Sequence, residues 1–180
     1  CLLRTDAPTI GHISDLVAAG NRAQLDDSEF RDELVDWIRF NPAAALRRRD
    51  GLAGRVNGQP PVPTPIGRLV APLVVRADNQ VALDRERITD SAGLAAFVAV
   101  DDDEAAWVES GRSFERFALQ ADLLGLRAAF VNQPIEVPEL RPELESALDT
   151  DVHVQLLVRF GSAPYAPYSL RRPLDDVICT

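Results

Sequence analysis

The stretch from Leu94 to Gly161 constrains the fold most strongly, because short apolar runs alternate in it with helical patterns. Leu94–Val100 is an apolar run compatible with a strand, and the acidic residues 101–104 that follow predict the start of a long helix over about 104–124. The pattern then predicts a glycine stop, a strand, a shorter helix with proline near its start, and a strand ended by glycine: Gly125, 126–131, 138–148, 152–160 and Gly161. Such alternation is typical of a layered α/β or α+β domain.

Two helical patterns precede this stretch. Residues 1–4 are typical of the end of a strand, and Thr9 opens a helix that we expect to stop at Gly20-Asn21. A second helix is predicted over about 28–40, with Asn41-Pro42 ending it. The chain therefore has two leading helices before its strands.

Residues 41–90 have a different composition. Five prolines lie between positions 60 and 72. A connection this long and rich in proline is typical of a lid, an arm or a mobile segment. The tail, residues 162–180, also contains prolines, and we expect it to be extended.

Composition limits the class of protein. The 180 residues are 46% hydrophobic and 26% charged, which predicts one globular domain over 1–180. No apolar run reaches 18 residues, so we expect no membrane span. The net charge of −9, with arginine as the only basic residue apart from two histidines, disfavours nucleic acid and anionic membranes as partners.

Two features bear on where the chain comes from. It contains no methionine, from which we expect a processed or truncated piece, and it shows no signal-peptide pattern. Cys1 and Cys179 allow a disulfide, but reduced cysteines in a cytosolic protein are the favoured interpretation.

Few residues suggest catalysis by themselves. His12 and His153 lie far from each other and from any glycine-flanked nucleophile, and no phosphate-binding glycine loop is present. His153 is expected on a strand face or in the core. The acids 101–104 resemble metal ligands, but capping of a helix explains them better.

Two arginine clusters are candidates for anion binding. The run 47–49 is more typical of a solvated surface than of a site. Arg171 and Arg172 follow an extended, proline-rich stretch, and a guanidinium can hold a phosphate through two hydrogen bonds. Adjacent side chains on an extended segment point opposite ways, so only one of the two would reach a given phosphate.

The order of these patterns resembles that of nitroreductase-like flavoproteins. The resemblance rests on a helix that begins with Trp and ends in Gly-Leu, a Gln-Pro-Ile-Glu segment, a last core strand and a basic C-terminal arm: 107–126, 133–136, 154–161 and 171–174. The early residues 16–24 and 30–37, with Asp50-Gly51, are similar to one branch, the Acg-like nitroreductases of actinobacteria, whose chain holds two nitroreductase-like halves.

The resemblance implies a fold, a cofactor and a set of site residues. The fold would be α+β, a nitroreductase-like mixed and largely antiparallel sheet flanked by helices. FMN would bind between two such units, with Gln133, Pro134, Ile135 and Glu136 beside the flavin ring and Arg171 and Arg172 at the phosphate. The activity would be that of a cytoplasmic oxidoreductase that transfers hydride from NAD(P)H to a nitroaromatic or quinone-like acceptor.

The sequence departs from the family pattern at two points. Val137 stands where simple nitroreductases often have glycine, and the N-terminal phosphate-binding motif of the family is not found here. These departures imply the C-terminal half of a longer chain, which needs that chain's N-terminal half or a second copy to complete its site. They also keep two alternatives open: a protein that binds or sequesters FMN without catalysis, and a structural dimerisation half.

Overall fold

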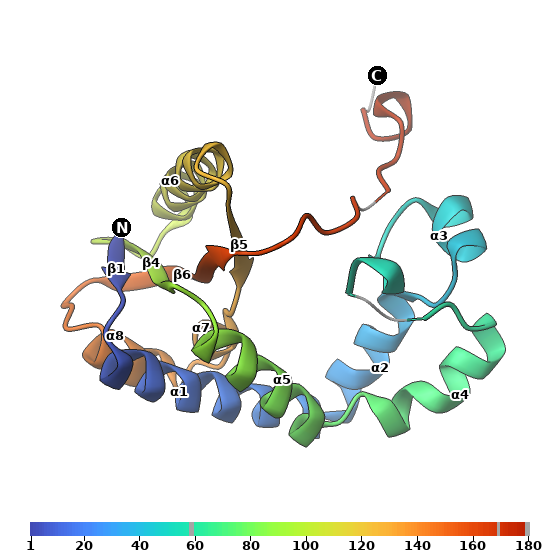
Figure 1. Cartoon of the computed structure of the whole chain (residues 1–180), viewed down its shortest axis with the longest axis horizontal. Coiled ribbons are helices and arrows are strands. Elements are labelled where there is room, and N and C mark those ends of the chain that lie inside the picture. The colour runs from blue at the N-terminus through green and yellow to red at the C-terminus, as the bar shows by residue number, and fades with distance from the viewer. Residues whose placement is uncertain (58–59, 169, 179–180) are drawn as a thin grey trace. The chain divides into compact units, whose positions relative to one another are not determined.

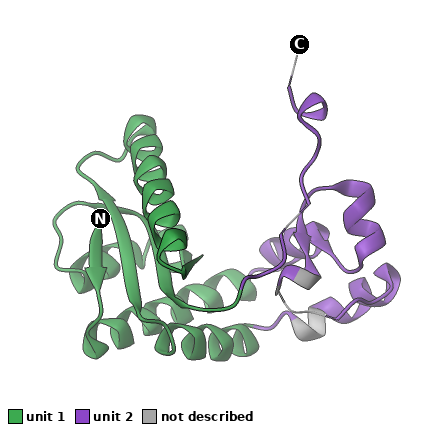
Figure 2. Cartoon of the chain, turned by 45° about the horizontal axis from the view of Figure 1, so that its top comes forward, with its two compact units in different colours: residues 1–26, 77–164 green, residues 27–76, 165–180 purple. Residues whose placement is uncertain are grey.

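The computed structural model describes residues 1–57, 60–168 and 170–178. The chain divides into two compact units (Figure 2). Unit 1 comprises residues 1–26 and 77–164, and unit 2 comprises residues 27–76 and 165–180.

Unit 1 is built on an antiparallel sheet with the strand order β1-β4-β6-β5 (Figure 1). The strands are β1 (Leu2–Arg4), β4 (Gly93–Ala99), β5 (Leu126–Phe130) and β6 (His153–Ser162). β6 pairs with β4 on one side and with β5 on the other. The predicted α+β class with a largely antiparallel sheet is confirmed.

Helices cover both faces of this sheet. α1 (Ala7–Asp26), α5 (Ala77–Thr89) and α8 (Arg141–Ala147) pack on one face. Their core joins them to β4 and β6 through buried aliphatic side chains: Ile13, Leu16, Val17, Ile88, Leu94, Leu144, Leu148, Val154 and Leu157. α6 (Glu104–Leu123) packs on the other face, where Phe97 lies 5.7 Å from Phe114 and 5.6 Å from Phe117 between ring centroids.

The predictions for α6 and the strands around it are confirmed. The Asp103 side chain accepts a hydrogen bond from the Ala106 amide and caps α6, as the capping interpretation expects. Gly125 follows the helix with φ of 74°, a conformation that favours glycine. β6 continues past the predicted stop, because Gly161 pairs with Arg127 of β5.

Two helix boundaries in unit 1 differ from the prediction. α1 does not stop at Gly20-Asn21 but continues to Asp26, because Gly20 lies against a neighbouring turn and Asn21 is buried. α8 begins at Arg141 rather than near Pro138, with Pro142 in its first turn.

Unit 2 contains shorter elements. They are α2 (Ser28–Trp37), β2 (Ile38–Arg39), α3 (Pro42–Arg48), β3 (Leu52–Ala53), the 3-10 turn η1 (Gly54–Asn57), α4 (Thr64–Val74) and the 3-10 turn η2 (Leu174–Asp176). β2 pairs in parallel with β3. The prediction that the second helix reaches residue 40 is wrong, because the chain leaves it after Trp37 to form β2.

Residues 41–90 are more regular than their composition suggests. They hold α3, α4 and α5, and Val81 and Ile88 of α5 are buried in unit 1. The predicted lid or arm stays a prediction for residues 41–76 alone. Residues 163–168 and 170–173 have no regular structure, as expected, before η2 begins.

Candidate functional site

The predicted flavin-lining segment is a single helical turn, α7 (Gln133–Glu136), directly after β5. The amides of Ile135 and Glu136 donate to the Asn132 carbonyl at 2.8 and 3.0 Å, and the Val137 amide donates to the Gln133 carbonyl at 3.2 Å. Proline at position 134 has no N–H. The backbone donors of 134–137 are therefore already used within the turn.

The Gln133 side chain belongs to a buried polar cluster that joins three helices. Asn21 of α1 donates to the Asp84 carboxylate of α5 at 2.9 Å, and Gln80 donates to the same oxygen at 3.0 Å. Gln133 donates to the Asn21 side-chain oxygen at 3.2 Å and contacts Asp84 at 3.4 Å. Only 3% of Asn21 and 7% of Asp84 is exposed, so amide donors take the place of water around this carboxylate.

A close backbone approach fixes this cluster. A Cβ atom at Gly20 would lie 2.7 Å from the Gln133 Cβ and 2.9 Å from its carbonyl carbon. Glycine is therefore required in the middle of α1, where it otherwise weakens a helix. Among the described residues, the buried side-chain oxygen of Gln133 has no hydrogen-bond partner.

The other residues of the turn face different surroundings. Pro134 is fully buried, and Ile135 packs against the core of unit 1. Glu136 is exposed and accepts a hydrogen bond from Gln24 at 2.7 Å. Of the four predicted residues, only Glu136 is exposed.

Arg171 and Arg172 lie in the C-terminal tail of unit 2, and both are exposed. Arg171 makes only a long hydrogen bond, 3.4 Å, to the Leu170 carbonyl. Within the described part of the chain neither guanidinium forms an ion pair, so both can bind an anion such as phosphate. They belong to unit 2, whereas Gln133–Glu136 belong to unit 1.

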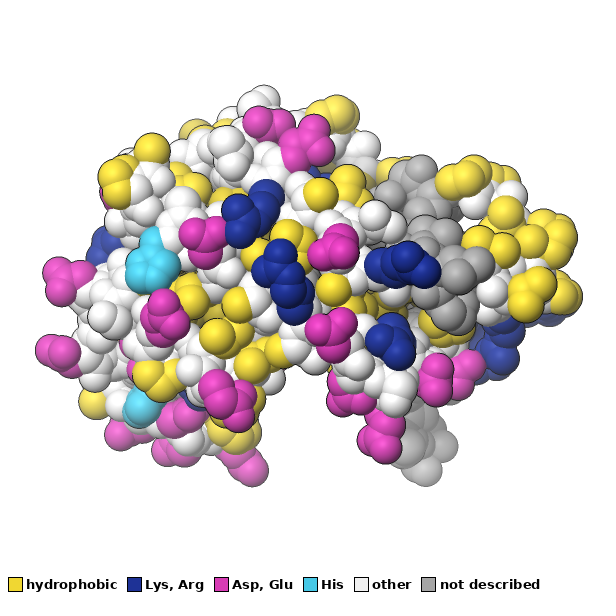
Figure 3. All heavy atoms as spheres, turned by 90° about the horizontal axis from the view of Figure 1, so that it is seen from below, with side chains coloured by type: hydrophobic (Ala, Val, Ile, Leu, Met, Phe, Trp, Pro, Cys, Tyr) yellow, Lys and Arg dark blue, Asp and Glu magenta, His cyan; other side chains and the backbone are white. Residues whose placement is uncertain are grey.

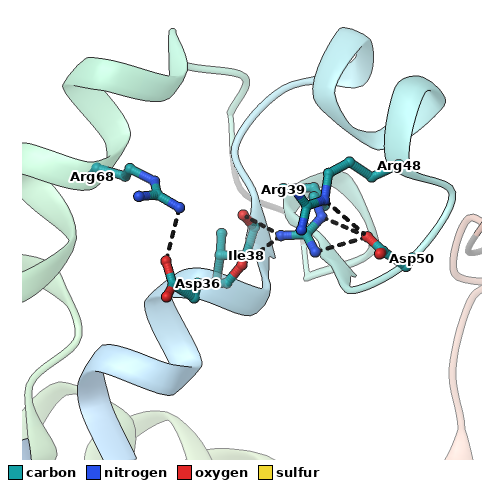
Figure 4. A network of polar contacts seen from close by, with 6 residues as sticks. All are labelled: Asp36, Ile38, Arg39, Arg48, Asp50 and Arg68. Carbon is teal, nitrogen blue, oxygen red and sulfur yellow. Dashed lines mark hydrogen bonds and ion pairs between the residues drawn. The ribbon is translucent and has the colours of Figure 1, made fainter. Parts of the chain in front are cut away.

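Unit 2 also contains a buried arginine (Figure 4). Arg39 donates to one Asp50 carboxylate oxygen through Nε at 2.9 Å and Nη2 at 2.7 Å, and to the Asp36 carbonyl at 2.6 Å. Its guanidinium carbon lies 5.8 Å from the centre of the Trp37 ring. The hydrogen bond from Arg39 lowers the pKa of Asp50, with smaller effects from the charges of Arg39, Arg48 and Arg172. All of these interactions are with groups of unit 2. Arg39 therefore stabilises this unit and is not a candidate for ligand binding.

The run 47–49 is exposed, as expected for a solvated surface. Arg48 lies 3.7 Å from the Asp50 carboxylate, and Arg49 ends α3 with φ of 52°. Figure 3 shows acidic side chains beside arginines on the face that it presents.

The acids 101–104 fix one end of α6. Asp102 accepts from the Trp107 indole at 2.7 Å, from Gln155 at 3.0 Å and from Arg141 at 2.9 Å. These hydrogen bonds, led by that of Trp107, hold the pKa of Asp102 well below its usual range. In the described residues no group of three or more His, Cys, Asp or Glu side chains is placed to hold a metal.

Both histidines contact glutamates of α8. His12 lies 3.2 Å from Glu143, and His153, at the start of β6, lies 3.5 Å from Glu145. Both are exposed, so His153 is a surface rather than a core histidine. Cys1 is exposed, and Cys179 lies outside the described residues.

Sequence reasoning missed Asn21, Gln80 and Asp84. Asn21 matched a helix-stop signal, which concealed its role inside α1. Gln80 and Asp84 lie four residues apart and share a face of α5, a spacing that indicates contact within a helix but not burial.

No protein-family model matches the chain, and no curated protein matches it. Among the described residues, no helix is both long and apolar enough to cross a membrane.

Proposed function

We propose that the chain is one half of an FMN-dependent NAD(P)H oxidoreductase of nitroreductase type. The proposal rests on the resemblance of its ordered motifs to that family, and the antiparallel sheet with a long helix on one face agrees with it. The observation that carries it is the exposed pair Arg171 and Arg172, two adjacent cations with no ion-pair partner in the described residues of an otherwise acidic protein.

The chain's own residues would bind and orient the cofactor. A guanidinium of the Arg171-Arg172 pair would bind the FMN phosphate through charge-assisted hydrogen bonds. Glu136 is the member of the predicted ring-lining group with an exposed polar side chain. Bound FMN would supply the redox chemistry, which is to take hydride from NAD(P)H and pass electrons to a nitroaromatic or quinone-like acceptor.

The proposal includes a second nitroreductase-like half. The site would be completed by an N-terminal half of the same chain or by a second copy, which makes the active form a pseudo-dimer or a homodimer. A cytoplasmic location belongs to the same proposal.

A second candidate is a half that holds flavin, or only pairs with another half, without catalysis. The conformation of α7 favours it, because the Ile135, Glu136 and Val137 amides are bonded within the turn and Gln133 is held by Asn21 and Asp84. Steady NAD(P)H oxidation with a nitroaromatic acceptor would exclude this candidate.

FMN retention tests the proposal. We expect the double variant Arg171→Ala/Arg172→Ala to bind FMN at least about tenfold more weakly, because each charge-assisted hydrogen bond contributes roughly 1.5–3 kcal/mol. The matched control is Arg47→Ala/Arg116→Ala, which removes two exposed cations and causes the same change in net charge. Equal affinity of wild type and the Arg171/Arg172 variant would overturn the role of the pair.

A further inference from the structure

Arg159 is a charged residue in the middle of a sheet. It lies on β6, one of the two inner strands, and its cross-strand partners are Leu94 of β4 and Ala129 of β5. Leu157, two residues earlier, is buried in the core beneath α1, α5 and α8. Because side chains alternate along a strand, Arg159 faces the same helices.

Arg159 has no partner among the described residues, since no hydrogen bond or ion pair joins it to another group there. It is nevertheless partly buried. Several other arginines of unit 1 are paired, such as Arg85 with Asp15 at 2.5 Å and Arg141 with Asp102 at 2.9 Å. A partly buried guanidinium with no bonded acceptor can donate its hydrogen bonds to an anion from solution.

The charges around Arg159 favour an anion as well. Burial lowers the pKa of Arg159, and the positive charge of Arg87 on α5 lowers it further. Asp84 opposes this effect, but its carboxylate already accepts hydrogen bonds from Asn21 and Gln80. Arg87 lies 3.9 Å from the other Asp84 oxygen. Arg159 and Arg87 carry two positive charges, and Asp84 carries one negative charge. One positive charge beside the polar cluster is therefore not balanced.

We propose that Arg159, assisted by Arg87, forms an oxyanion-binding site on unit 1. The planar guanidinium matches a phosphate or a carboxylate group of a small molecule. The site uses none of the residues assigned above to FMN, so it stands or falls independently of the proposed oxidoreductase function.

Thermal unfolding of the full chain with sodium phosphate or sodium acetate, at ionic strength matched with chloride, tests the site. We expect the midpoint of wild type to rise with the concentration of at least one of the two anions, as for any ligand that binds the folded state. Arg159→Gln should bind that anion at least about tenfold more weakly, since it loses charge-assisted hydrogen bonds. The anion that acts identifies the ligand group as phosphate or carboxylate.

Two controls separate binding from general salt effects. Arg116→Gln changes an exposed arginine on α6 and should respond like wild type. The comparison is repeated in an Arg171→Ala/Arg172→Ala background, which removes the cations assigned to the FMN phosphate. The midpoint of that variant should still rise with the anion, and adding Arg159→Gln to it should reduce the rise. An equal response in Arg159→Gln, or no response of wild type to either anion, would overturn the proposal.

A measurement on unmutated protein covers the case in which Arg159→Gln fails to fold. Phenylglyoxal modifies accessible arginines, and peptide mass spectrometry locates the product. We expect the anion that raises the midpoint to slow modification of Arg159 and to leave Arg116 unaffected. Equal modification of Arg159 with and without that anion would contradict the site.

Discussion

Arg39 and Arg68 form ion pairs in the same unit but in different surroundings. The Arg39 side chain is 6% exposed and makes its hydrogen bonds to Asp50 and the Asp36 carbonyl, whereas Arg68 pairs with the Asp36 carboxylate at the surface. Burial, rather than the number of contacts, decides what each pair contributes to stability.

We expect Arg39→Met to lower the free energy of unfolding by about 2–3 kcal/mol, because it removes the charge-assisted hydrogen bonds of a buried guanidinium to the partly buried Asp50 and to the Asp36 carbonyl. Arg68→Met should cost less than about 1 kcal/mol. Urea unfolding followed by Trp37 fluorescence in a Trp107→Phe background measures both. Equal losses in the two variants would show that Arg39 is not the anchor of unit 2.

The lowered pKa of Asp102 predicts that the stability of the fold depends on pH. Its pKa in the folded chain is lowered by hydrogen bonds from Trp107, Gln155 and Arg141, so its ionised form stabilises the fold. This stability is complete above the pKa of the unfolded chain, about 4, and is lost as the pH falls toward the folded-state pKa.

We therefore expect Asp102→Asn to reduce the loss of stability between pH 6 and pH 3. The urea midpoint, followed by circular dichroism at both pH values, measures it. Asp101→Asn, which changes the exposed neighbour, should keep the pH dependence of wild type. A wild-type pH dependence in Asp102→Asn would contradict the assigned role.

At the scale of elements, α1 contains two glycines in opposite situations. A Cβ at Gly11 meets no atom within 4 Å, whereas a Cβ at Gly20 would overlap Gln133 of α7. The same substitution should therefore change stability in opposite directions along one helix.

Gly11→Ala should stabilise the chain by about 0.5–1 kcal/mol through helix propensity. Gly20→Ala should destabilise it by about 1–3 kcal/mol, because the contact between α1 and α7 must open. Thermal or urea unfolding of the two variants measures both. Stabilisation by both substitutions would show that α7 does not pack closely on Gly20.

The elements also show how far sequence reasoning reaches. α6 could be predicted to within one residue because its cap, its apolar stripe and Gly125 are local signals. The ends of α1 and α2 could not be predicted, because burial of Asn21 and pairing of β2 with β3 override local stop and start signals. The Arg171-Arg172 pair could be found from sequence, but the buried partners of Gln133 depend on contacts between distant helices.

At the scale of the whole molecule, the chain contains two compact units, and each carries some of the residues proposed to bind FMN. Unit 1 carries the sheet, α7 and the buried cluster around Asp84, and unit 2 carries Arg171 and Arg172. The confirmed α+β fold agrees with the nitroreductase resemblance but does not itself select a cofactor. The central claim is therefore that the chain binds FMN.

Visible absorption after incubation with FMN and removal of free flavin tests that claim most directly. The account predicts retained flavin absorption in this chain, or in the chain with a preceding half if the site needs it. Arg171→Ala/Arg172→Ala should lose that absorption, and Arg47→Ala/Arg116→Ala should keep it. No retained flavin in either form of the protein would contradict the account.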